Sequence, residues 1–151
     1  MSSRRPSIAH EPSLVELARW CDVLMVAVRA HDDTRGLIDR EIIEAVGPNG
    51  TLINITRGFV VDEDALIAAL KDGRLGQAGL DVFEPEPPAH HPLFDHPSVT
   101  LTPHLMGLTR RGTELTFADA AQGVVDVLAG RRPVAVANPD WSSAPGIPAS
   151  A

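Results

Sequence analysis

Residues 51–87 read TLINITRGFVVDEDALIAALKDGRLGQAGLDVFEPEP. The residues from 51 to 55 are mostly apolar and predict a strand, and residues 78–83 predict another. Between them, apolar residues recur at helical spacing after Asp62, which can cap a helix. Polar residues gather where the two strands end, and open α/β sheets place their ligand sites at that edge. The stretch therefore predicts a strand, helix and strand with a candidate site at the carboxyl ends of the strands.

The rest of the chain alternates strands and helices in the same way. The pattern predicts helices from Ser13 onward, at 39–46 and at 110–129, and further strands at 23–28 and 99–102. This alternation favours an α/β fold with a mainly parallel sheet and right-handed crossovers. Because residues 23–28 are nearly all apolar, we expect helices to cover both faces of that strand. The proline-rich segment 84–98 is expected to run over the surface.

Composition excludes several classes of function. The 151 residues carry a formal net charge of −7, which argues against a nucleic-acid surface. No apolar stretch approaches the length of about 18 residues that a membrane span needs. Cys21 is the sole cysteine, so no internal disulfide is possible and a cytoplasmic location is expected. His90, His91 and His96 lack regular ligand spacing, so we expect no metal site.

Three ionisable residues follow the ends of predicted strands: Arg57, Glu86 and His104. Because parallel strands end at one edge of a sheet, we expect these side chains to converge there. A guanidinium offers a planar fork for a carboxylate, and a histidine beside a carboxylate can act as a general acid and base. The residues alone leave a plainer interpretation open, in which all three are solvated loop residues.

Four blocks resemble, in order and at fitting spacing, the signatures of the D-isomer-specific 2-hydroxyacid dehydrogenases. They are NITRG at 54–58, VDE at 61–63, GLDVFEPEP at 79–87 and TPH at 102–104. The resemblance implies an oxidoreductase that transfers a hydride between NAD or NADP and a small-molecule 2-keto or 2-hydroxy acid. It implies that Arg57 binds the substrate carboxylate and carbonyl, that His104 is the proton donor and acceptor, and that Glu86 orients and tunes His104.

The resemblance also implies a cofactor site. Asp81 would contact the nicotinamide carboxamide, while the backbone at Thr56 and Arg57 and from His104 to Gly107 would line the nicotinamide. By the same resemblance, residues 13–107 form a partial dinucleotide-binding domain. We expect a polar segment at 1–12, a helix with a return segment at 108–141 and a disordered tail at 142–151.

The sequence departs from the family in one consequential way. It contains no G-x-G-x-x-G turn, which holds the cofactor diphosphate in dinucleotide-binding folds. We therefore predict an incomplete Rossmann-like, doubly wound parallel sheet that lacks the first strand and its Gly-rich turn. The strand from Val23 should then pair directly with the strand from Thr51 or lie displaced beside a gap. The alternative function is a catalytically inactive, truncated remnant that cannot bind the dinucleotide alone.

Smaller departures concern the cofactor and the partners. Arg4 and Arg5 stand near where NAD users of the family carry an acid, and a guanidinium pair suits the 2′-phosphate of NADP, so either cofactor is open. Arg29 stands where the family usually has a proline, and Met106 where it usually has a small residue. Open sheet edges invite pairing with another chain, so we expect a homo-oligomer or a complementing chain, without nucleic-acid or membrane partners.

Overall fold

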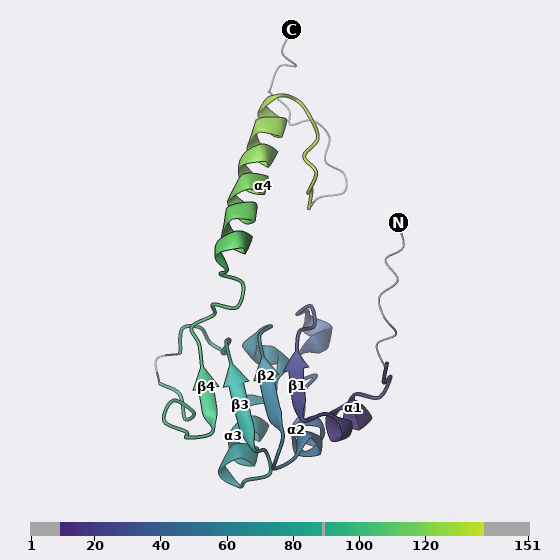
Figure 1. Cartoon of the computed structure of the whole chain (residues 1–151), viewed down its shortest axis with the longest axis vertical. Coiled ribbons are helices and arrows are strands. Elements are labelled where there is room, and N and C mark those ends of the chain that lie inside the picture. The colour runs from purple at the N-terminus through teal and green to yellow at the C-terminus, as the bar shows by residue number, and fades with distance from the viewer. Residues whose placement is uncertain (1–9, 89, 138–151) are drawn as a thin grey trace. The chain divides into compact units, whose positions relative to one another are not determined.

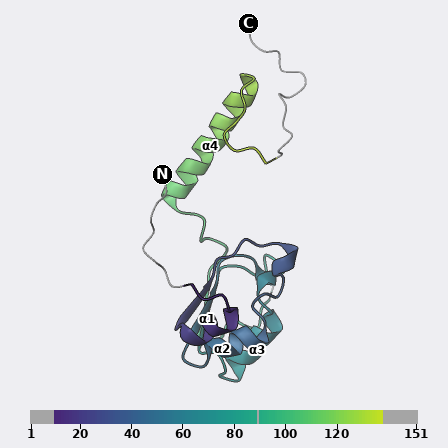
Figure 2. The ribbon, with the colours of Figure 1, turned by 90° about the vertical axis from the view of Figure 1, so that its right-hand side faces the viewer.

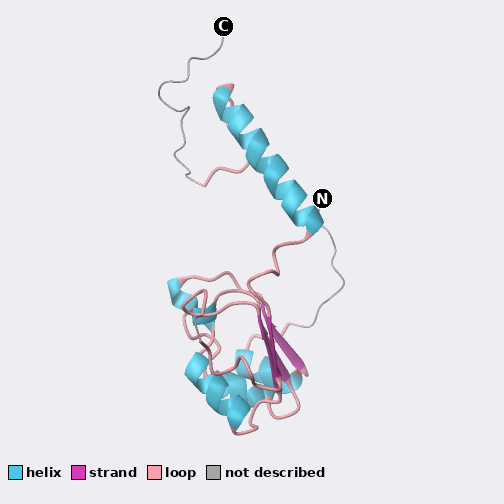
Figure 3. Cartoon of the chain, turned by 90° about the vertical axis from the view of Figure 1, so that its left-hand side faces the viewer, coloured by secondary structure: helices cyan, strands magenta, loops and turns pink. Residues whose placement is uncertain are grey.

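The computed structural model describes residues 10–88 and 90–137. These residues form two compact units that divide between Leu105 and Met106. The first unit is a parallel four-stranded sheet with three α-helices packed against one face (Figure 1, Figure 3). The second is built on one long helix. The predicted α/β fold with a parallel sheet is thereby confirmed, and the predicted domain boundaries at residues 12, 107 and 141 stay predictions.

The sheet has the strand order β1-β2-β3-β4, and every pair is parallel. The strands are β1 (Val23–Val26), β2 (Thr51–Asn54), β3 (Gln77–Leu80) and β4 (Val99–Leu101). Val23 is in register with Thr51, and Val26 with Asn54. The strand from Val23 therefore pairs directly with the strand from Thr51, which is one of the two predicted outcomes. All four strands point their carboxyl ends to the same edge of the sheet (Figure 1).

Three helices of the first unit begin at residues whose side chains cap them. They are α1 (Leu14–Trp20), α2 (Arg40–Val46) and α3 (Glu63–Lys71), with Ser13, Asp39 and Asp62 as caps. Each cap oxygen accepts a hydrogen bond from a backbone N–H of the first turn, a group that has no partner within the helix. Two short 3-10 helices, η1 (Asp32–Thr34) and η2 (Gly58–Val60), lie in the connections. Helix α2 contacts both α1 and α3 (Figure 2).

The core lies between the helices and one face of the sheet. Its fully buried side chains include Ile43, Leu52, Leu66 and Leu75. Strand β1 buries Leu24 and Val26 but leaves Val23 52% and Met25 51% exposed. Within the first unit, the expectation that helices cover both faces of this strand is wrong, because α1, α2 and α3 all lie on the same side of the sheet (Figure 3).

Two predicted features of the loops also differ from the structure. The strand predicted over 78–83 ends at Leu80, because Asp81 turns to accept hydrogen bonds from the segment that follows β4. The segment 84–98 does not run wholly over the surface, since His91 is 6% and Leu93 0% exposed. The rings of Phe83, His91 and Phe94 lie against one another, which draws this part of the loop inward.

The second unit consists of helix α4 (Arg110–Leu128) and the segment that follows it. The Thr109 hydroxyl accepts a hydrogen bond from the Gly112 N–H at the start of the helix. Gly130, with a φ of 67°, ends it in the left-handed conformation that favours glycine. Arg131 then bonds back to Asp126, and these hydrogen bonds hold the pKa of the Asp126 carboxyl below its usual value. Among the described residues, no helix combines the length and apolar character that crossing a membrane requires.

Candidate active site

The turn that carries Arg57 is shaped by Asn54, the last residue of β2, whose side chain is buried. Its Oδ1 accepts hydrogen bonds from the Thr56 N–H at 3.0 Å and the Thr56 hydroxyl at 2.8 Å. Its Nδ2 donates to the Arg57 carbonyl at 2.9 Å. The amide thus takes the place of backbone partners where the chain leaves the sheet, so Arg57 is presented at a fixed position.

Gly58 lets this turn approach the loop after β3. A Cβ at Gly58 would lie 2.2 Å from the Phe83 carbonyl carbon and 2.5 Å from the Glu84 nitrogen. These are backbone atoms, which cannot rotate aside as a side chain can. A residue without a side chain is therefore required for the Arg57 turn to pack against the loop that carries Glu86.

Glu86 and His104 form the polar centre of the candidate site. Glu86 Oε1 accepts a hydrogen bond from the Phe83 N–H at 2.8 Å, and Oε2 lies 2.8 Å from His104 Nδ1. Their side chains are 33% and 43% exposed, so the pair is accessible. An imidazole held by a carboxylate at Nδ1 carries a proton there, which leaves Nε2 to exchange a proton with a ligand.

Opposing effects act on the Glu86 carboxyl. Burial raises its pKa, but the hydrogen bonds from His104 and the Phe83 N–H and the charges of His104 and Arg57 outweigh burial, so the pKa lies below its usual value. Glu86 therefore stays ionised beside the imidazole.

Asp81 joins the carboxyl ends of three strands. Its side chain is buried, and Oδ1 accepts hydrogen bonds from the Thr102 hydroxyl at 2.5 Å and the Leu105 N–H at 2.8 Å. Its own N–H donates to the Asn54 carbonyl at 3.0 Å. Asp81 thereby holds the segment on which His104 lies. Its predicted contact with a nicotinamide carboxamide stays a prediction.

His104 has a φ of 55°, and it is the sole non-glycine residue with a positive φ in the ranges 10–88 and 90–137. This left-handed conformation costs an L-residue roughly 1–2 kcal/mol. The backbone is held there by the bonds on either side, from the His104 N–H to the Thr102 carbonyl and from the Leu105 N–H to Asp81. Strain of this kind, maintained by its surroundings, is concentrated at functional sites.

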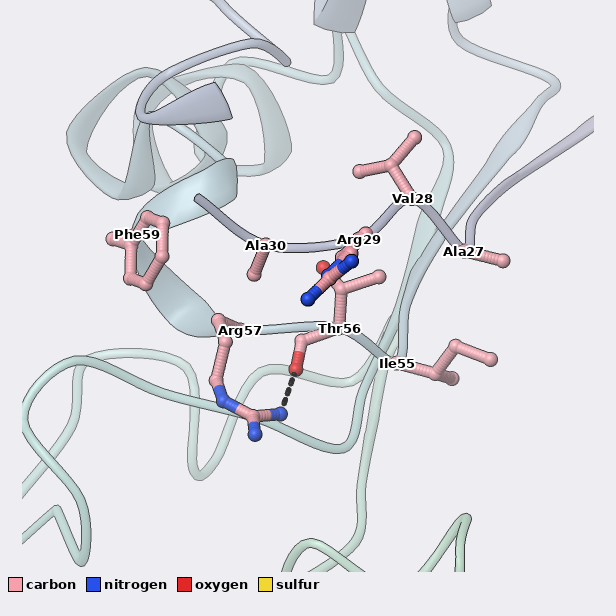
Figure 4. Close-up of a pocket in the computed structure, with 8 residues that line it drawn as sticks. All are labelled: Ala27, Val28, Arg29, Ala30, Ile55, Thr56, Arg57 and Phe59. Atoms are coloured by element: carbon pink, nitrogen blue, oxygen red, sulfur yellow. Dashed lines mark hydrogen bonds between the residues drawn. The ribbon is translucent and has the colours of Figure 1, made fainter. Parts of the chain in front are cut away.

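Two cavities open at this edge of the sheet. One, of about 290 Å³, is lined by Phe83, Glu86, Pro87, Pro103 and His104. The other, of about 530 Å³, lies at the ends of β1 and β2 and is lined by residues 27–30, residues 55–57 and Phe59 (Figure 4). Arg57 lines the second, where its guanidinium donates to the Thr56 carbonyl at 2.6 Å.

The structure therefore brings Glu86 and His104 into contact and places Arg57 on the same edge. Thr56 is buried below the turn and bonded to Asn54. Gly107 belongs to the second unit, so its predicted contact with the cofactor stays a prediction. The remaining two predicted cofactor residues, Arg4 and Arg5, lie outside the described residues.

Two positioning residues escaped the sequence interpretation. Asn54 lies within a quoted block but was given no role of its own. His91 was considered only as a metal ligand, whereas its ring is buried, with Nδ1 accepting from the Leu93 N–H and Nε2 3.0 Å from Glu63 Oε1, out of line for a hydrogen bond. Within residues 10–88 and 90–137, no three His, Cys, Asp or Glu side chains are grouped to hold a metal. For Asn54, the sequence signal of a positioning role is a single amide side chain at the end of an otherwise apolar strand.

Comparison with known proteins matches residues 3–106 to the D-isomer specific 2-hydroxyacid dehydrogenase, NAD binding domain. The chain belongs to this family. Hydroxyphenylpyruvate reductase of Plectranthus scutellarioides is 49% identical over 111 residues, which cover 74% of this chain and 35% of that protein. The chain thus spans about a third of the length of this relative of the 2-hydroxyacid dehydrogenase family.

Solved structures of 2-hydroxyacid dehydrogenases share the fold. The enzyme from Ketogulonicigenium vulgare is 41% identical with a TM-score of 0.78, and the match covers 89% of this chain and 42% of that one. The NADPH-dependent glyoxylate/hydroxypyruvate reductase of Sinorhizobium meliloti, solved with NADP and malonate, is 34% identical with a TM-score of 0.71, over 87% of this chain and 43% of that one. Both matches rest on less than half of the longer chain.

Proposed function

We propose that this protein is an oxidoreductase of the D-2-hydroxyacid dehydrogenase type, which transfers a hydride between NAD or NADP and a 2-keto or 2-hydroxy acid. The observation that carries the proposal is the contact between Glu86 and His104 at the carboxyl edge of the sheet. A carboxylate and an imidazole paired in this way form a general acid and base, and membership of the family supplies the reaction.

The chain's own residues account for the chemistry at the substrate. The protonated imidazole of His104 would donate from Nε2 to the carbonyl oxygen during reduction, while ionised Glu86 stabilises the imidazolium. Arg57 would hold the substrate carboxylate with its guanidinium and offset the negative charge that develops on the carbonyl oxygen. The reverse reaction uses the neutral imidazole as the base.

A bound nicotinamide dinucleotide would supply or accept the hydride. The cavity of about 530 Å³ beside Thr56 and Arg57 gives a ligand room at the ends of β1 and β2. The sequence contains no G-x-G-x-x-G turn for the diphosphate, and this favours the alternative that these 151 residues alone do not hold the dinucleotide. Thr56 and Arg57 therefore fit the nicotinamide end of the cofactor, and whether the chain holds the diphosphate end is the question to test.

Titration of NADH and NADPH fluorescence against the purified chain separates the two functions. Saturable binding in the micromolar range supports the enzyme, and its absence supports the alternative. The preferred cofactor is whichever binds more tightly. Turnover of a series of 2-keto acids should then be lost in Arg57→Ala and His104→Ala and retained in the control Arg40→Ala, since Arg40 is exposed and lines neither cavity.

The proposal extends to association and location. Strand β1 is at one edge of the sheet, and its outer side pairs with no described strand. This supports association with a second copy or a complementing chain, because an unpaired edge offers free backbone donors and acceptors. Light scattering of the purified chain tests it, and a monodisperse monomer would contradict it. The single cysteine, Cys21, supports a cytoplasmic location, which fractionation of cells would test.

A further inference from the structure

The proline-rich segment 84–98 contains a histidine whose ring is buried beside helix α3. His91 Nδ1 accepts a hydrogen bond from the Leu93 N–H at 3.2 Å, so the proton of the neutral ring is carried by Nε2. Nε2 lies 3.0 Å from Oε1 of Glu63, the first residue of α3. The ring therefore presents an N–H donor to a carboxylate where the loop meets the helix.

This donor has no aligned acceptor. Among the residues that the structure describes, His91 Nε2 is the sole buried side-chain nitrogen or oxygen without a hydrogen-bond partner. A buried N–H without an acceptor is costly, so a folded chain that keeps one needs a reason for it. The Glu63 side chain is 34% exposed and has room to rotate, whereas the His91 side chain is 5% exposed and is held by its packing. A rotation of the carboxylate alone completes the hydrogen bond.

The ring of His91 also contacts the segment that holds the acid and base pair. Its centroid lies 5.4 Å from that of Phe83, at an interplanar angle of 66°. The Phe83 N–H donates to Glu86 Oε1, and Glu86 Oε2 lies 2.8 Å from His104 Nδ1. His91 lines neither of the two cavities at this edge of the sheet, so it acts on the pair through Phe83.

We propose that Glu63 and His91 form a tie that positions Glu86 against His104. The tie joins the first turn of α3 to the loop after β3. It holds the Phe83 backbone where its N–H reaches Glu86, and Glu86 in turn keeps the imidazole of His104 in one orientation. Both members of the tie are positioning residues, because neither touches the reacting atoms. The proposal rests on the proposed function for its role in catalysis, but the position of Glu86 can be measured in a chain without activity.

Loss of the tie should change the titration of Glu86 in a direction that charge alone does not produce. The hydrogen bond from the Phe83 N–H is one cause of the lowered pKa of Glu86. In Glu63→Ala and in His91→Phe that bond should weaken, so the pKa of Glu86 should rise toward its usual value. Removal of the Glu63 charge without any displacement would instead lower this pKa, because a like charge is lost. Carbon-13 NMR of the side-chain carboxyl groups measures the titration.

Three comparisons separate the tie from other effects. Asp64→Ala removes the neighbouring carboxylate from the same first turn of α3 and leaves the one beside His91 in place, so it should not raise the pKa of Glu86. Glu63→Gln keeps an acceptor oxygen at the same reach and should restore most of the titration of the unaltered chain. His91→Phe keeps an aromatic ring in the loop but has no N–H, so it tests the donor apart from the packing of the ring.

A double-mutant cycle tests the contact itself. Glu63→Ala and His91→Phe, alone and combined, should show a coupling of about tenfold in the folded-to-unfolded ratio measured in urea, as for a hydrogen bond to a charged group. If the unaltered chain turns over 2-keto acids, both variants should lower kcat and leave KM unchanged, because Arg57 stays in place. Absence of turnover in the unaltered chain would contradict the proposed function and not the tie, which the titration of Glu86 decides.

The proposal is overturned if the two substitutions are additive, or if the pKa of Glu86 in Glu63→Ala is no higher than in Asp64→Ala. A failure of His91→Phe to fold does not prevent the decision. Glu63 and Asp64 are both accessible at the start of α3, and the comparison of their alanine variants by itself confirms or overturns the tie.

Discussion

Replacing Gly58 by alanine adds one methyl group where two loops of the candidate active site meet. The new Cβ would lie 2.2 Å from the Phe83 carbonyl carbon and 2.4 Å from its oxygen. Carbon atoms pack best at about 3.5 Å or more, so the two backbones must separate by more than about 1 Å. Inserting a methyl group into a well-packed site costs about 1–3 kcal/mol, and the contact with backbone places this case at the upper end.

We therefore expect Gly58→Ala to lower the free energy of unfolding of the first unit by about 3 kcal/mol, roughly a hundredfold in the folded-to-unfolded ratio. The displaced segment carries the Phe83 N–H that holds Glu86, so the contact between Glu86 and His104 should loosen as well. Urea titration followed by two-dimensional NMR of amides in β2 and β3 measures the stability of this unit. The ring nitrogen signals of His104 report the contact.

Gly79→Ala is the matched control. Its Cβ would lie 3.6 and 3.8 Å from the two γ-carbons of Ile53, which is ordinary contact. Alanine also restricts the unfolded chain more than glycine does, which favours folding by roughly 0.5–1 kcal/mol. We expect this variant to equal or exceed the unaltered chain in stability. A Gly58→Ala variant within about 0.5 kcal/mol of Gly79→Ala would refute the packing argument.

Three further substitutions test the support of the site. Asn54→Ala removes three hydrogen bonds from the Arg57 turn. At about 1 kcal/mol for each bond, the free energy of unfolding of the first unit, measured in urea, should fall by about 3 kcal/mol. A fall below about 1 kcal/mol would contradict this role for Asn54. Because the pKa of Glu86 is lowered in the folded chain, its ionised form stabilises the fold at pH values above the usual glutamate pKa, and this contribution is lost as the pH falls through the lowered pKa. The difference in free energy of unfolding between the unaltered chain and Glu86→Gln should therefore shrink in acid. A difference that does not change with pH would exclude this linkage. His91→Ala removes a buried ring that contacts both Phe83 and Phe94, so proteolysis within residues 84–98 should become faster. The control His96→Ala should change the rate of proteolysis less. Equal rates in the two variants would count against an anchoring role for His91.

Short sequence patterns were sufficient to predict most of the helices and strands. The helix predicted from Ser13 onward begins after Ser13, and Asp62 caps the helix it was expected to cap, because a cap depends on residues within one turn. Counting which strands of a doubly wound sheet the sequence contains left two outcomes for the strand from Val23, and direct pairing with the strand from Thr51 is the one observed.

The remaining features of the fold depend on contacts between residues far apart in the sequence, and no short sequence pattern indicates them. The strand from residue 78 stops at Leu80 because Asp81 bonds to Thr102, 21 residues later. An apolar run reads the same whether one or both of its faces are covered, so the exposure of Val23 and Met25 could not be foreseen. The burial of His91 depends on two phenylalanines that fold around it.

The candidate site likewise has features that the sequence predicts and features that depend on long-range contacts. The meeting of Glu86 with His104 was predictable, since parallel strands bring their carboxyl ends to a common edge. The reason for Gly58 was not, because the backbone that it must avoid belongs to a different loop. The cavity shared by Arg29 and Arg57 likewise needs the pairing of β1 with β2, which no short motif encodes.

The uncovered face of the sheet has a practical consequence at the bench. Environment-sensitive dyes such as ANS fluoresce on contact with accessible apolar surface, and Val23 and Met25 supply such surface in the folded first unit. A dye-based melting experiment on this chain would therefore begin from a bright baseline at low temperature. That brightness would come from native molecules, and screening buffers for the dimmest starting signal would select for conditions that cover this face.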